Sequence, residues 1–181
     1  MAVLPAQAGG MLGTRQRIHT IAMKLRDFLE QWGLKGLKLN LGFLAADFAP
    51  SDPDRAAAWD LYIELLTRIT TQELPPDTGD ENAALKSIHA LFPLTRAILK
   101  KHGSGAGEFA KVAIPVLNQI IRPFTAKWHR LSLAHAFDSP AQCAQFRTDL
   151  AQLQVKLRNY TRALAAMAAV EDLTALEDNG A

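Results

Sequence analysis

Hydrophobic residues at helical spacing form one long stripe in the second half of the chain, between positions 108 and 131. They recur three or four residues apart for about six turns. A helix with so broad an apolar face is buried against other helices. The residues of this stripe are Phe109, Val112, Ala113, Val116, Leu117, Ile120, Ile121, Phe124, Trp128 and Leu131.

Prolines at positions 115 and 123 lie inside this predicted helix. Each proline removes a backbone hydrogen-bond donor and crowds the carbonyl four residues earlier. Pro115 falls almost opposite the stripe, where the freed carbonyl can meet water. Pro123 lies nearer the edge of the buried face, so we expect a kink there. A break into two helices at Arg122 is the alternative.

Three other stretches, 53–72, 80–102 and 139–169, also predict long helices. Ser51 and Asp52, followed by proline, are typical of a helix start. Residues 143–167 form a heptad seam, which favours packing inside a bundle over a dimer interface. The buried face predicted for the first of these helices consists of Ala56, Trp59, Tyr62, Ile63, Leu66 and either Ile69 or Thr70.

The N-terminal residues follow different patterns. Residues 1–13 are small and aperiodic, which predicts a disordered tail. Residues 14–36 predict an amphipathic helix that ends at Gly33 in the left-handed conformation. Residues 37–43 alternate between apolar and polar, which predicts an extended strap with no second strand to pair with in this chain. Met23 opens a more ordinary sequence, so an alternative is that the native chain starts there.

These patterns together predict an all-α protein. We expect a bundle of four long helices over residues 37–177, with the N-terminal amphipathic helix and the extended strap packed on its outside.

Composition narrows the class of protein further. Hydrophobic residues make up 49% of the 181 residues and charged residues 21%, which excludes a mainly disordered chain. No run of 18 apolar residues is present, so no membrane-spanning segment is expected. Cys143 is the only cysteine and is expected to be a buried structural thiol. These features predict a cytoplasmic protein.

Charge is unevenly distributed along the chain. Residues 44–85 carry a net charge of −7, from nine acids and two bases, and residues 86–130 carry +7, from eight bases and one acid. Acidic and basic helices that neutralise each other explain this, and a surface for an anionic ligand or nucleic acid is the alternative. The candidate residues for such a surface are Arg96, Lys100, Lys101, Lys111, Arg122, Lys127, His129 and Arg130.

No pattern of catalytic, cofactor-binding or metal-binding residues emerges from the sequence. Asp60, Glu64 and Arg68 stand four residues apart, which is typical of ion pairs on a helix surface. The five histidines show no metal-ligand spacing. Residues 103–107 are glycine-rich but follow a predicted helix and lack the ending of a phosphate-binding loop. We therefore expect no cofactor and no metal.

Several segments resemble an uncharacterised bacterial all-helical family over about residues 37–177. The family resemblance implies an all-helical fold and an association with bacterial conflict or anti-phage loci, and it transfers no functional residues. The segments that carry it are WDLYIELLTR at 59–68, LFPLTR at 91–96, VLNQIIRPFTAKWH at 116–129 and VEDLT at 170–174.

Three functional hypotheses follow. The first is a non-enzymatic helical adaptor that docks a protein partner or a second copy of itself, in a bacterial defence system. The second is a nucleic-acid or nucleotide binder that uses the basic region 96–130. The third is an enzyme whose site assembles from Asp60, Glu64, Arg68, Arg122 and His129.

Overall fold

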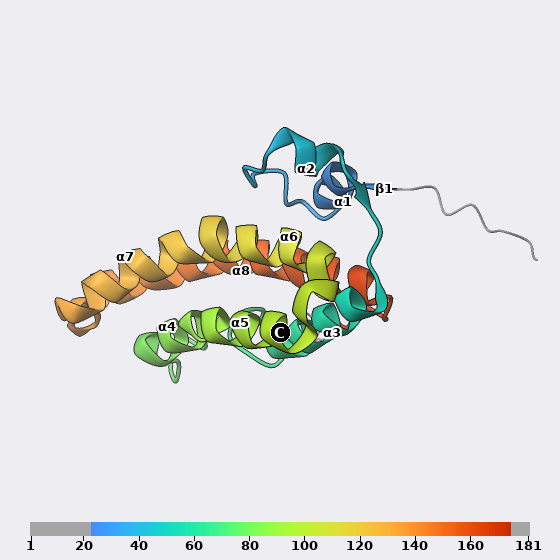
Figure 1. The fold of residues 1–181 in the computed structure, drawn as a ribbon. Coiled ribbons are helices and arrows are strands. Elements are labelled where there is room, and N and C mark those ends of the chain that lie inside the picture. The colour runs from blue at the N-terminus through green and yellow to red at the C-terminus, as the bar shows by residue number, and fades with distance from the viewer. Residues whose placement is uncertain (1–22, 175–181) are drawn as a thin grey trace, which may run out of the picture.

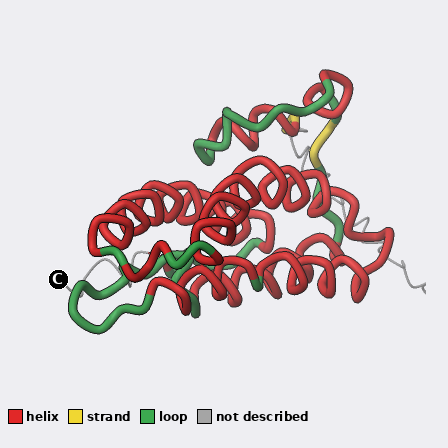
Figure 2. The backbone as a smooth tube through the Cα atoms, turned by 90° about the vertical axis from the view of Figure 1, so that its left-hand side faces the viewer, coloured by secondary structure: helices red, strands yellow, loops and turns green. Residues whose placement is uncertain are grey.

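A computed structural model describes residues 23–174, and this part of the chain is all-α apart from one two-stranded sheet (Figures 1 and 2). The expectations for residues 1–13, for a helix start at Thr14 and for the end of the bundle at 177 lie outside the described residues. The elements are β1 (Met23–Lys24), α1 (Leu25–Gln31), α2 (Leu41–Ala45), β2 (Asp47–Phe48), α3 (Asp52–Leu66), α4 (Glu81–His89), α5 (Leu91–His102), α6 (Gly107–Pro115), a π-helical segment (Val116–Ile121), α7 (Arg122–Leu133) and α8 (Pro140–Ala168), with 3₁₀ turns at Gly103–Ala106 and Ala136–Asp138.

The long helices lie beside one another. In Figure 1, α6, α7 and α8 form one side of the molecule, and α3, α4 and α5 form the other. Within the described chain, no helix combines the length and the hydrophobicity needed to cross a bilayer.

The stripe between positions 108 and 131 is buried as predicted, except that Leu117, Ile120 and Leu131 are only partly buried. Phe109, Val116 and Trp128 are fully inaccessible to solvent. The helical backbone runs without a break from α6 through the π-helical segment into α7, so Pro123 does not end the helix. π-helical turns and prolines are both common at irregular points in helices, and here the π-helical segment lies between Pro115 and Pro123.

Helix α3 departs from the sequence prediction in its length and in its buried face. It ends at Leu66 rather than near residue 72, because the hydroxyls of Thr70 and Thr71 donate to the Leu65 carbonyl in place of the next backbone turns. The predicted face was right only in part: Tyr62 and Thr70 are buried, but Trp59 and Ile63 lie at the surface. The buried residues of α3 are Asp54, Ala57, Ala58, Leu61, Tyr62 and Leu65.

The predicted helix 80–102 is divided into α4 and α5 at Ala90, which keeps helical backbone angles. Pro93 then falls in the first turn of α5, where a missing N–H is tolerated. The heptad seam of α8 packs inside the molecule against α3, as predicted. Its first member, Cys143, is partly buried; its thiol donates to the Phe137 carbonyl, and burial raises its pKa, as for a structural thiol.

Residues 23–48 form a small N-terminal module that lies outside the long helices (Figure 1). The predicted helix does not run through Met23 and Lys24, which pair with β2 in antiparallel register. Neither of these strands belongs to the predicted strap at 37–43, which forms no strand. The predicted strap is irregular up to Asn40 and then becomes α2, because the Asn40 side chain caps that helix by accepting from the Gly42 N–H.

The module is attached to the bundle through both polar and apolar contacts. The Gln119 side chain accepts from the Lys38 N–H at 2.7 Å and donates to the Lys38 carbonyl at 2.9 Å. Gly33 adopts a left-handed φ of 67°, as predicted, and a Cβ at this position would lie 2.8 Å from the amide nitrogen of Asn159. The turn after α1 thus approaches α8 more closely than another residue would allow.

Candidate functional site

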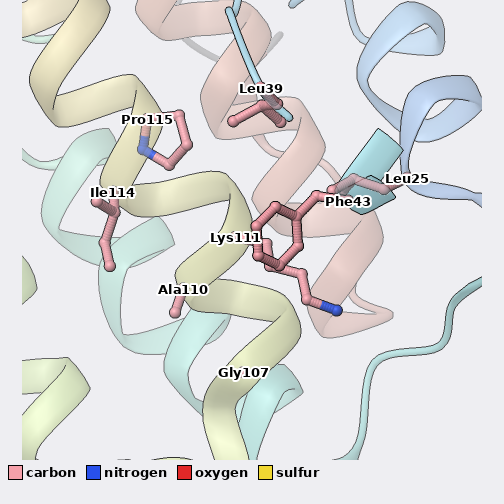
Figure 3. A pocket seen from close by; sticks show the side chains of 8 residues that line it. All are labelled: Leu25, Leu39, Phe43, Gly107, Ala110, Lys111, Ile114 and Pro115. Atoms are coloured by element: carbon pink, nitrogen blue, oxygen red, sulfur yellow. The ribbon is translucent and has the colours of Figure 1, made fainter. Parts of the chain in front are cut away.

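An apolar groove separates the N-terminal module from α6 (Figure 3). Its volume is about 310 Å³. Its walls come from two distant parts of the chain, which are the module on one side and α6 on the other. The lining residues are Leu25, Leu39, Phe43, Gly107, Ala110, Lys111, Ile114 and Pro115.

The local structure of the module sets the direction of its apolar side chains. Leu39 precedes the Asn40 cap and Phe43 lies in α2, so the change from irregular chain to helix brings both into the groove wall. On the other wall, Ala110 and Ile114 lie one turn apart on α6. Phe43 and Ile114 remain 54% and 45% exposed.

The groove offers almost no polar chemistry. Lys111 is its single charged lining residue, and the Lys111 ammonium is paired with Glu108 at 2.6 Å. No carboxylate, hydroxyl, thiol or imidazole lines the walls. Such a surface suits the burial of apolar side chains from another polypeptide better than it suits a reaction.

The eight predicted basic residues do not form one surface. Three of them are paired with carboxylates: Lys101 with Asp60, Lys111 with Glu108, and Lys127 with Asp149. Arg122 donates to the Asn118 side chain and lies 4.9 Å from the centre of the Phe92 ring. The side chains of the remaining four make no hydrogen bond or ion pair with any residue that the structure describes; they are Arg96, Lys100, His129 and Arg130.

The ion pair between Lys127 and Asp149 is supported by further hydrogen bonds to the Asp149 carboxylate. Burial raises the pKa of the Asp149 carboxyl, but hydrogen bonds from Lys127, Gln145 and the Trp128 indole N–H outweigh this effect, so the pKa lies below its usual range. Lys127 is therefore committed to an intramolecular partner rather than free for an anionic ligand.

The five residues of the enzyme hypothesis are divided among separate places. Asp60 and Glu64 line a second groove of about 520 Å³ between α3 and α5, together with the exposed Trp59 and Ile63. Arg68 is paired with Glu64 at 2.6 Å. Arg122 and His129 lie on α7 and do not line this groove. Across residues 23–174, no group of three or more His, Cys, Asp and Glu side chains could hold a metal ion.

Asp60 is the best-connected acid in the second groove. Its carboxylate accepts from the Lys101 ammonium at 2.9 Å and lies 2.8 Å from the His102 imidazole. Burial raises the pKa of Asp60, but the hydrogen bonds from His102 and Lys101 outweigh it and hold the pKa below its usual range. These contacts join α3 to the end of α5, which is a structural role.

We expect Asp60→Asn to destabilise the protein at neutral pH and to have little effect in acid. Because the folded-state pKa is lowered, the ionised carboxylate stabilises the folded state above the ordinary aspartate pKa of about 4. That contribution is lost as the pH falls through the folded-state value. Urea unfolding of wild type and Asp60→Asn at about pH 7 and about pH 3 measures the difference in their free energies of unfolding. A difference that stays constant between the two pH values would contradict the role given to Asp60.

Comparisons with protein-family models, curated proteins and solved structures find no match to this chain. The resemblance to a bacterial helical family therefore remains a prediction.

Sequence reasoning missed the groove between the module and α6. Leu39 and Phe43 belonged to the predicted strap, and Ile114 lies outside the predicted stripe. The alternation of apolar residues in the strap was the one available signal, because it left Leu41 and Phe43 without an obvious partner.

Proposed function

We propose that this protein is a non-enzymatic adaptor that docks an amphipathic helix of a partner protein in the groove between the N-terminal module and α6. The observation that carries the proposal is an open groove whose lining is apolar except for one neutralised lysine. A helix with apolar residues at i, i+3, i+4 and i+7 is the common occupant of grooves of this kind.

The surface around the groove also supports docking. Phe43 and Ile114 are half exposed at its mouth, and Leu41 and Met23 are further exposed apolar residues of the module. Covering one large apolar side chain contributes about 1 to 3 kcal/mol, so a few such contacts offset the cost of association and give reversible binding.

Ile114→Asp is expected to abolish capture of the partner. The aspartate places an unpaired charge in an apolar wall, and it should not unfold the protein because Ile114 is 45% exposed. The matched control is Val155→Asp on α8, a residue that is 55% exposed and does not line the groove. The measurement compares proteins recovered with the tagged wild type and with each variant from cells that make this protein naturally.

The docking proposal requires a protein that is recovered with wild type and Val155→Asp and lost with Ile114→Asp. Recovery of free monomer alone would count against the proposal. If wild type is a dimer in sedimentation and Ile114→Asp is a monomer, the groove joins two copies of this chain instead. Deletion of residues 1–22 tests whether that segment competes for the groove.

Nucleic-acid binding is the second candidate function, and one observation favours it. Glu108 is the only acidic residue between positions 91 and 137, so α5 and α7 carry bases without acids of their own. Local positive charge of this kind attracts phosphate groups as well as acidic proteins.

A further inference from the structure

A third groove lies between α4 and α7, at the opposite end of the molecule from the N-terminal module (Figure 1). Its volume is about 610 Å³. It combines an apolar floor with a polar rim. The lining residues are Asn82, Leu85, Lys86, His89, Ala90, Pro93, Thr125, His129, Ser132 and Leu133.

The charged and titratable residues of this rim are all basic. Lys86, His89 and His129 are exposed, and no acid lines the groove. The side chains of Lys86 and His129 make no hydrogen bond or ion pair within the described residues. The acid of α4, Glu81, is bound to Arg147 at 2.7 Å and faces α8.

A further cation extends the positive surface beyond one end of the groove. Arg122 lies one turn before the lining residue Thr125 on α7. The Arg122 guanidinium rests over Phe92, the residue next to Pro93 in the groove wall. Of the helices that line the groove, α5 and α7 contain no acid and α4 contains only Glu81.

The floor decides which anionic partner fits. Leu85, Ala90, Pro93 and Leu133 provide apolar contacts, and Leu133 is left 71% exposed. Phosphate groups gain nothing from such a floor. No Trp, Tyr or Phe side chain lines it to stack on a nucleic-acid base. An amphipathic helix satisfies both parts of the groove, because its apolar side chains cover the floor while its carboxylates meet the rim.

We propose that the groove between α4 and α7 binds an acidic amphipathic helix of a protein partner. This site is separate from the groove beside the N-terminal module and differs from it in having basic side chains on its rim. The protein then has two docking sites at its two ends, and one of them selects its partner by charge.

The test uses fluorescence anisotropy on the full chain with three labelled probes. The first is a helical peptide of about 16 residues with leucine at i, i+3, i+4 and i+7 and glutamate elsewhere. The second peptide has lysine in place of each glutamate, and the third probe is a single-stranded DNA of similar length. We expect the acidic peptide to bind with a Kd of about 10 to 100 μM and the other two to bind more weakly.

Two substitutions locate the binding site. Lys86→Glu should weaken binding of the acidic peptide about tenfold, because it turns an attraction into a repulsion. Lys100→Glu is the matched control: it is an exposed lysine on α5 with no partner among the described residues, and it lies outside the groove. Its effect should be less than about twofold. Leu133→Ser should weaken binding of the acidic peptide, because it removes an apolar contact, and should leave DNA binding unchanged.

Three results would overturn the proposal. The first is DNA binding that is tighter than peptide binding and is lost in Lys86→Glu, which would assign the groove to nucleic acid. The second is an equal effect of the two charge reversals, and the third is no peptide binding at about 1 mM. Partner capture by the Ile114→Asp variant of the other groove is independent of all three, so either proposal can fail while the other stands.

Discussion

Trp128→Ala is expected to lower the free energy of unfolding by about 4 kcal/mol. The indole is fully buried, stacks on Phe137 at 5.9 Å between ring centres and meets the edge of Phe146 at 5.1 Å. Its Nε1–H donates to Asp149 at 3.0 Å. Alanine leaves a cavity at this aromatic cluster and removes one of the hydrogen bonds that stabilise the Asp149 carboxylate.

The same substitution at Trp59 provides the control. Trp59 is 43% exposed on α3 and its ring lies 5.8 Å from that of Tyr62, so Trp59→Ala should cost about 1 kcal/mol or less. Urea unfolding followed by far-UV circular dichroism compares the two variants with wild type. If both substitutions lower the free energy of unfolding equally, burial of Trp128 contributes no more to stability than the exposed Trp59 does.

The stripe could be predicted because its residues are apolar on one side of the helix and polar on the other. Phe109, Val116 and Trp128 share one face for the length of three elements, and only burial explains such a regular arrangement. The π-helical segment was not predicted, because the spacing of apolar residues does not distinguish a short π-helical turn from α-helix.

Part of the buried face of α3 was predicted wrongly because this helix is apolar on more than one side. Trp59 and Ile63 suggested a core face by their size, but both lie at the surface, while the small residues Ala57 and Ala58 are fully buried. Small side chains allow two helix backbones to approach closely, and this packing advantage does not appear in hydrophobic periodicity.

The candidate sites depended on contacts between distant residues, which one sequence does not reveal. Lys101 pairs with Asp60 across 41 positions, and Lys127 pairs with Asp149 across 22. These pairs removed two bases from the predicted basic surface. Lys86 and His89 were not predicted to act with His129, because α4 meets α7 only in the folded chain.

Asp54→Asn is expected to lower the free energy of unfolding by about 3 kcal/mol. The Asp54 carboxylate is buried, with one oxygen accepting from the Ser51 N–H at 2.9 Å and the other from the Phe109 N–H at 2.9 Å. One side chain thus caps α3 and also satisfies the first turn of α6. An asparagine amide offers a single acceptor, so its NH₂ group must face one of these two donors.

Asp52→Asn is the matched control, since Asp52 lies in the same first turn of α3 but is exposed. It should cost less than about 1 kcal/mol, through its weaker interaction with the helix dipole. Urea unfolding measures both variants, and amide hydrogen exchange at Phe109 should accelerate in Asp54→Asn alone because that N–H loses its acceptor. If Asp54→Asn and Asp52→Asn destabilise the protein equally, the carboxylate of Asp54 acts as a helix-end charge and does not join α3 to α6.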